Sequence, residues 1–307
     1  MEGLTSRWSR LPEGLQSALS SSLIILKFVI PFYILSDVLL YFDLLRPLGL
    51  FLSPLTALLN LPVEAGPALI GGMFLNVYTS IAFAAPLHLS PHQWTVLGIY
   101  IGICHSLLVE SAIMARLGIS TVYAVTLRVL AALIAVVPLV LLGREGQGSG
   151  AVVQNSPEIA TRHFDSFFSM LLHSATEALL LSAKVIVLVC ALILLMDWIK
   201  SIPAVKAHIE RVNTTFSILV GQLLGITYGA GILLREANRG SLSRRDIFFI
   251  GTFLMICHSS IEDILVFVLF GANFWIILGV RLVTALLLSW LLLRIFRGKA
   301  LDYVMRK

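Results

Sequence analysis

Residues 89–106 read LSPHQWTVLGIYIGICHS, and residues 242–259 read LSRRDIFFIGTFLMICHS. The two stretches repeat one pattern at a constant offset of 153 residues and end on the same four residues, Ile-Cys-His-Ser. Beyond them the same offset aligns a carboxylate, a glycine and an arginine: Glu110 with Asp263, Gly118 with Gly271, and Arg128 with Arg281. The chain therefore contains two related halves, and both halves carry the same kinds of ionisable residue.

The composition is that of a polytopic membrane protein, because 58% of the 307 residues are hydrophobic and only 13% are charged. A helix that crosses a bilayer needs about 20 mostly apolar residues. The sequence predicts such spans at 21–42, 93–116, 120–142, 166–196, 246–270 and 273–296. The net charge of +5 comes from connecting segments, where the positive-inside rule explains it without nucleic acid. The three cysteines lie in apolar segments and do not indicate a disulfide framework.

The distribution of Lys and Arg predicts that the two halves are inverted in the membrane. Four arginines mark one loop of the second half as cytoplasmic: Arg235, Arg239, Arg244 and Arg245. The equivalent loop of the first half, 88–92, has no Lys or Arg and should face outward. Matching loops on opposite sides require an odd number of crossings in each half. The same rule places both chain termini in the cytoplasm, and the protein is expected in the inner (plasma) membrane.

Two glycine-rich apolar stretches, 63–87 and 214–234, are predicted to be re-entrant helical hairpins. Basic residues on both sides of 214–234 place its two ends on the cytoplasmic side, so this element should enter the membrane and return. The alternative, in which both stretches cross completely, would break the charge rule. The expected fold is an all-α integral membrane protein with two inverted repeats, each of three transmembrane helices, a re-entrant hairpin and a surface helix.

The predicted domains are a first repeat over 1–142, a polar Gly-rich linker over 143–165 and a second repeat over 166–307. Three amphipathic segments are expected to lie at the membrane surface: 4–20, 44–61 and 201–213.

The repeated ionisable residues predict a site near the membrane midplane. Its candidate residues are His105, Glu110, His258, Glu262, Asp263, and Asn76, Gly229 and Gly231 of the hairpins. On an ideal helix, residues five apart such as His105 and Glu110 differ by about 140°, so they could face one point only if the helix is distorted or buried on a wide face. Imidazole and carboxylate groups suit Fe²⁺, Zn²⁺ or Mn²⁺, with His105, Glu110, His258 and Asp263 as ligands. The same groups could instead relay protons.

Structural roles compete with this interpretation. Arg128 and Arg281 could form buried ion pairs with Glu110 and Asp263 that only hold helices together. A transmembrane histidine can serve as a hydrogen-bond donor between helices. An enzyme is not expected, since the chain has no P-loop, no HExxH and no nucleophile elbow.

Longer motifs recur in the two halves. The second half contains GQLLGITYGAGILLREANRGSLSRRD, ICHSSIEDILVFVLFGAN and the segment around Arg281. The first half, with GGMFLNVYTSIAFAAPLHLS and ICHSLLVESAIMARLG, is a looser copy. These motifs resemble the Gate-domain family, also called the nucleoside-recognition family, and the resemblance covers 63–142 and 214–296. The family includes the membrane region of ferrous-iron transporters, sporulation maturation proteins and relatives of concentrative nucleoside transporters. The resemblance implies paired inverted units with a substrate path between them.

The sequence thus predicts a transporter that moves a small solute, with a divalent transition metal as the favoured substrate. Unlike the iron transporters, this chain has no nucleotide-binding segment, so it would move a metal alone, with a partner subunit or down a gradient. One alternative is a nucleoside or small organic solute coupled to H⁺ or Na⁺. Another is a membrane scaffold that transports nothing. Expected partners are the lipid bilayer and a second copy or a partner subunit, and no nucleic acid.

Overall fold

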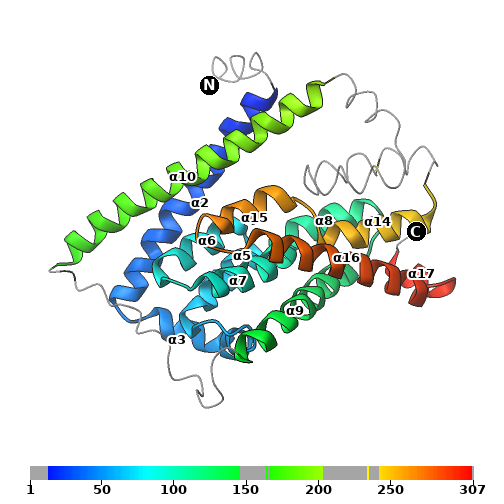
Figure 1. The fold of residues 1–307 in the computed structure, drawn as a ribbon, viewed down its shortest axis with the longest axis horizontal. Coiled ribbons are helices and arrows are strands. Elements are labelled where there is room, and N and C mark those ends of the chain that lie inside the picture. Colours follow the sequence, from blue (N-terminus) through cyan, green and yellow to red (C-terminus); the bar gives the residue numbers. More distant parts are fainter. Residues whose placement is uncertain (1–12, 146–163, 165, 203–233, 235–241, 306–307) are drawn as a thin grey trace.

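The computed structural model describes residues 13–145, 164, 166–202, 234 and 242–305. These residues form helices and no β-strand. Six helical spans are long and apolar enough to cross a membrane: Gly14–Tyr41, Pro91–Arg116, Thr121–Leu142, Phe167–Ile199, Arg244–Val268 and Phe274–Ile295. They match the six predicted spans, so the prediction of an all-α integral membrane protein is confirmed (Figure 1).

Two of the six spans are interrupted in the middle. The first consists of α7 (Pro91–Cys104) and α8 (Leu107–Arg116), and the second of α14 (Arg244–Ile256) and α15 (Ser260–Val268). Each break falls on the repeated Cys-His-Ser sequence. Ser106 and Ser259 adopt left-handed backbone conformations, with φ of 47° and 48°. On an unbroken helix His105 and Glu110 would point apart, so the first break is the kind of distortion that the sequence required for the two residues to face one point.

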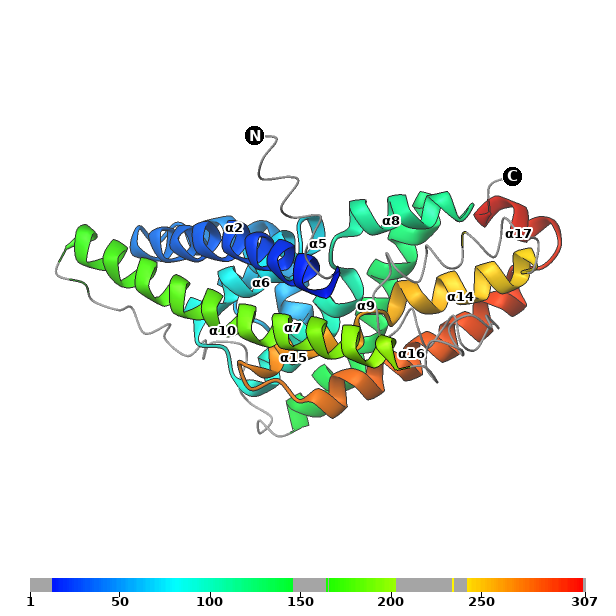
Figure 2. The same cartoon turned by 90° about the horizontal axis from the view of Figure 1, so that it is seen from above.

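The two interrupted spans also begin in the same way, with a serine that caps the first helix. Ser90 caps α7 in a reciprocal pair with Gln93, and Ser243 caps α14 in the same way with Asp246. Such capping boxes satisfy backbone N–H groups that a helix start leaves unpaired. In both Figure 1 and Figure 2, α14 and α15 run in the direction opposite to α7 and α8. This arrangement is what inversion requires, although inversion of the complete repeats remains a prediction.

The uninterrupted helices α2 (Glu13–Tyr41) and α10 (Phe167–Ser201) form an antiparallel pair on one side of the molecule (Figure 1). Near one end, Ser22 Oγ lies 3.3 Å from Cys190 Sγ; near the other, Ser174 donates to the buried carboxylate of Asp37. Because α2 begins at Glu13, residues 13–20 belong to the first span and not to the separate surface helix predicted over 4–20.

Helices also extend into two other segments that were predicted differently. The predicted linker 143–165 begins too early, since α9 (Thr121–Glu145) continues to Glu145. The predicted surface helix 201–213 overlaps α10 at Ser201, and its remainder from 203 lies outside the described residues.

The first glycine-rich stretch is a helical hairpin. Helices α5 (Gly66–Phe74) and α6 (Val77–Ala84) are joined by only Leu75 and Asn76. A side chain at Gly71 would press on Thr79 and Phe83, so the absence of a Cβ allows the two arms to approach closely. This hairpin agrees with the prediction for 63–87, whereas the second predicted hairpin, 214–234, lies almost wholly outside the described residues.

Short helices fill the connections. Before the hairpin come α3 (Leu45–Gly49), η1 (Leu50–Leu52), α4 (Ser53–Leu58) and η2 (Val63–Ala65), and the chain bends by 104° between Leu45–Leu58 and Val63–Phe74. After the hairpin comes η3 (Ala85–Leu87). The last span, α16 (Phe274–Ile295), is followed by α17 (Lys299–Val304).

We expect Gly49→Ala to destabilise the protein by about 1–3 kcal/mol, because a Cβ at this position would overlap the backbone carbonyl of Val63, which cannot move independently. Gly279→Ala is the matched control, since a Cβ there meets nothing within 4 Å and α16 gains a better helix former. Thermal unfolding of the purified protein in detergent measures both. Equal melting temperatures for the two variants would show that the close contact between Gly49 and Val63 does not require a glycine.

Candidate functional site

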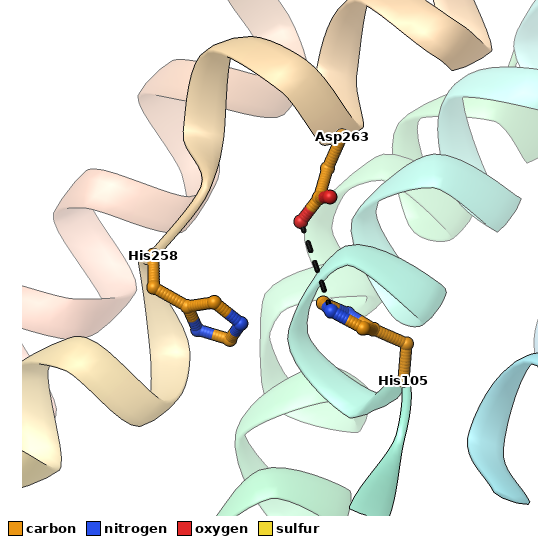
Figure 3. Close-up of side chains that lie close together, drawn as sticks. All are labelled: His105, His258 and Asp263. Carbon is orange, nitrogen blue, oxygen red and sulfur yellow. Dashed lines mark ion pairs between the residues drawn. The ribbon is translucent and has the colours of Figure 1, made fainter. Parts of the chain in front are cut away.

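The two helix breaks bring His105 and His258 together from opposite halves of the chain. Their ring centroids are 5.2 Å apart, with 41° between the ring planes. Both imidazoles are buried, and His258 is only 1% exposed. Figure 3 shows the two rings directed toward the same region, with Asp263 approaching from the start of α15.

The orientation of each imidazole is fixed by a hydrogen bond to the helix that precedes it. Nδ1 of His105 lies 3.0 Å from the carbonyl oxygen of Ile101, and Nδ1 of His258 lies 2.7 Å from that of Leu254. A carbonyl oxygen can only accept, so Nδ1 must carry the proton in both rings. The Nε2 atom of each ring is thereby left to face the cluster, as in histidines that bind metals.

Glu110 is the centre of the cluster. Its Oε1 atom lies 2.9 Å from His105 Nε2 and 3.2 Å from His258 Nε2, and its Oε2 atom lies 2.8 Å from Arg128 Nη2. The break makes the first of these contacts possible, because it releases His105 from the helical path that would turn it away from Glu110. Glu110 sits in the first turn of α8, where the partial positive charge of a helix start favours a carboxylate.

Asp263 occupies the equivalent place in the second half but is held more loosely. Its Oδ2 atom is 3.9 Å from His105 Nε2 and 3.9 Å from Arg281 Nη1. Asp263 Oδ2 and Arg281 Nη1, both buried, have no hydrogen-bond partner among the residues that the structure describes, and the same is true of Glu110 Oε2 and Arg128 Nη2. Both predicted ion pairs are therefore present. The distance between nitrogen and oxygen is short in Glu110–Arg128, at 2.8 Å, and long in Asp263–Arg281, at 3.9 Å.

Both arginines are fully buried and also bind carbonyl groups at the helix breaks. Arg128 Nε donates to Ile103 over 2.7 Å, and Arg281 Nε approaches Ile256 at 3.4 Å. Arg281 Nη2 adds a 2.8 Å hydrogen bond to the carbonyl of His258. The guanidinium groups thus pair with backbone carbonyls that no longer have a partner in a continuous helix.

Three of the four predicted metal ligands form a compact group. One ligand atom each from His105, His258 and Asp263 lies within 4.8 Å of the others. Around a tetrahedral zinc ion, ligands about 2.0–2.2 Å from the metal are about 3.3–3.6 Å apart. A small contraction of the group would therefore suffice to hold such an ion. Glu110 is adjacent to both imidazoles and is shared with Arg128.

The tip of the α5–α6 hairpin is attached to the first helix break. The backbone N–H of Ser106 donates to Gly72 over 3.1 Å, and its hydroxyl donates to Leu75 over 2.9 Å. The predicted site residue Asn76 also lies at this tip, but its side chain caps α6 by accepting from the N–H of Thr79. Asn76 therefore has a local structural role.

The remaining predicted site residues lie apart from the cluster or outside the described residues. Glu262 accepts a 3.0 Å hydrogen bond from the hydroxyl of Tyr78 on α6 and is not part of the histidine–aspartate group. Gly229 and Gly231 fall outside the described residues. The pairing of Tyr78 with Glu262, across 184 positions of sequence, has no signal in the sequence that could have predicted it.

These observations define the class: the chain is a multi-pass α-helical membrane protein with two discontinuous spans that meet at a buried ionisable cluster. It is similar to the protein named "Uncharacterized membrane protein YvoD" of Bacillus subtilis (strain 168), with 26% identity over 290 residues. That alignment covers 90% of this chain and 91% of the relative. No family model and no solved structure matches the chain.

Proposed function

We propose that this protein is a transporter whose substrate is a small cation, and that a divalent transition-metal ion is the favoured one. The observation that carries the proposal is the pair of imidazoles from opposite halves, His105 and His258. Each ring is oriented by a carbonyl of the helix that precedes it, and each directs Nε2 at the buried carboxylate of Glu110.

The interrupted spans support transport over a purely structural role. Non-helical backbone inside a membrane is tolerated where protein buries it or where it lines a watery path. In secondary transporters, discontinuous helices place helix ends beside the substrate near the midplane. Here the starts of α8 and α15 carry Glu110 and Asp263 in their first turns, and both breaks face the same cluster.

The donor set favours a transition metal over an alkali ion or an organic solute. Imidazole nitrogen with carboxylate oxygen suits Zn²⁺, Fe²⁺ or Mn²⁺, whereas Na⁺ prefers oxygen ligands alone. A nucleoside site would call on amide and aromatic groups of the hairpins. In the described hairpin, the Asn76 side chain caps α6 and the Tyr78 hydroxyl is bonded to Glu262.

The contacts of the two imidazoles with Glu110 also require bound protons when no metal ion is present. A bare Nε2 lone pair and a carboxylate oxygen repel each other at 2.9 Å, so the His105–Glu110 contact needs a proton or a cation between the two atoms. The same holds for the 3.2 Å contact between His258 and Glu110. Without metal the cluster must therefore hold protons, and a bound cation would replace them. Exchange of protons for a metal ion is a direct route to coupled transport.

Transport is tested with proteoliposomes that contain the full chain and a fluorescent zinc indicator. We expect zinc entry that is stimulated by an opposing proton gradient and abolished by His258→Ala. His92→Ala serves as the control, because His92 is an exposed residue in the first turn of α7. Zinc entry no faster than into empty liposomes would contradict transport and favour the scaffold. Uptake of nucleosides without metal would favour the organic-solute alternative.

We further expect zinc affinity to rise with pH, because protons and metal compete for the same Nε2 atoms. Linkage gives about a ten-fold increase in affinity per pH unit for each proton released, with about one to two protons released per zinc ion. Titration calorimetry in buffers of different ionisation enthalpy counts these protons. An affinity that does not change with pH, with no proton release, would eliminate the exchange.

A further inference from the structure

The membrane-facing surface contains a groove that plays no part in the ionisable cluster. It has a volume of about 540 Å³ and lies between α9, α16 and α17. Its walls are two stripes of apolar side chains, Leu127, Leu130 and Ile134 on α9 and Leu288, Leu292 and Phe296 along α16. Spacings of three and four residues keep each stripe on one face of its helix.

The groove has the length of a lipid chain in one leaflet. Its wall along α9 runs from Ser120, directly before the helix, to Ile134, which is about 21 Å at the rise of an α-helix. One leaflet contributes about 15 Å of hydrocarbon, and the polar headgroup region lies beyond it. An acyl chain could therefore lie along the whole groove with its headgroup at the Ser120 end.

Away from its Tyr303 end, little in the groove would attract a polar solute. The hydroxyl of Tyr123 is 2.8 Å from the hydroxyl of Thr252 on α14 and is already paired. The walls otherwise offer mainly carbon atoms to an occupant, as an acyl chain requires.

The open end of the groove lies among exposed basic side chains. There the C-terminal residues contact two internal segments: Ser120 N–H donates to Val304 over 2.8 Å, and Arg244 Nη2 donates to Met305 over 3.0 Å. Figures 1 and 2 show α17 beside the start of α14 and the end of α16. Exposed arginines flank this end on several elements: Arg116, Arg244, Arg245 and Arg297. Asp302 offsets one of them by pairing with Arg244.

We propose that the groove is a binding site for one acidic phospholipid. An acyl chain lies between α9 and α16, and the phosphate lies near Tyr303 and Arg297 at the basic end. Tyr303 is 87% exposed at this end, as expected of an aromatic side chain at the membrane interface. Basic residues near the surface attract anionic lipids individually, so several of them select acidic over neutral headgroups.

The test is native mass spectrometry of the purified full chain after addition of phosphatidylglycerol or phosphatidylcholine. We expect one phosphatidylglycerol to be retained and to raise the melting temperature, with phosphatidylcholine retained less. Ile134→Trp fills the groove and should abolish this retention. Leu141→Trp is its control, since Leu141 lies on the same face of α9 two turns further on, is similarly exposed (56% against 54%) and lies outside the groove.

A second pair of variants tests the headgroup. Arg297→Gln should weaken phosphatidylglycerol binding about five-fold without affecting phosphatidylcholine. Arg46→Gln, a change of an exposed arginine on α3, should leave both unchanged. Equal retention of the two lipids, or equal effects of the two tryptophan variants, overturns the proposal. A wild-type dimer that Ile134→Trp dissociates also overturns it, because a second copy would then occupy the groove.

Discussion

Arg128→Met is expected to destabilise the protein by about 3–5 kcal/mol, the cost of removing one partner from a buried ion pair. The substitution leaves the carboxylate of Glu110, 7% exposed, without its 2.8 Å contact to a guanidinium group. It also removes the donor that binds the carbonyl of Ile103 at the first helix break. Unfolding of the purified protein in detergent, by heat or denaturant, measures the loss.

A double substitution separates the ion pair from simple packing. Arg128→Met combined with Glu110→Gln leaves neither charge buried, so much of the lost stability should return. Arg281→Met is a comparison from the second half, where the guanidinium lies 3.9 Å from Asp263, and it should cost less. If the double variant is no more stable than Arg128→Met alone, the Glu110–Arg128 pair is not what stabilises this region.

The double variant His105→Ala/His258→Ala is expected to lower zinc affinity at least about 100-fold, since even changes to residues behind metal ligands cost about 10–100-fold. Two of the three ligands in the compact group would be lost. Competition with a chromophoric chelator, after removal of any affinity tag, measures the change. The fold should survive, because Glu110 keeps Arg128 as its partner.

His92→Ala is the control for this measurement, as it removes an exposed imidazole from the same helix, α7. If the double variant binds zinc as the wild type does, the metal site is placed wrongly. If His92→Ala loses as much zinc affinity as the double variant does, zinc binds at the protein surface. If neither protein binds zinc, iron or manganese, the cluster is a proton relay or a structural network, and the proposed substrate is wrong.

Much of the fold could be predicted from sequence because membrane helices are specified by local composition. An apolar run of sufficient length must be helical in a bilayer, where no water satisfies the backbone. That rule located all six spans and, with the clustered glycines, the hairpin of 63–87. The 153-residue repeat likewise predicted that Arg128 and Arg281 would lie near the acidic residues of their halves.

The helix breaks could not be predicted, because Ile-Cys-His-Ser contains neither glycine nor proline. A serine in the left-handed region is unfavourable locally and persists only when its surroundings compensate. At Ser106 these surroundings are the hairpin tip, which accepts two hydrogen bonds at Gly72 and Leu75. The first break is therefore a tertiary effect, and it decides where the imidazole of His105 points.

The unequal roles of the two acids also emerge only in three dimensions. Glu110 is one methylene longer than Asp263 and reaches both imidazoles, whereas Asp263 remains 3.9 Å from His105. By itself, the amino-acid sequence determined the membrane class, the spans and the duplicated ionisable residues, because these follow from hydrophobicity and spacing along the chain. Only the tertiary structure decided that the spans break, which acid meets both histidines, and where lipid-facing helices leave a groove. These features depend on contacts between segments about 150 residues apart, which no local pattern encodes.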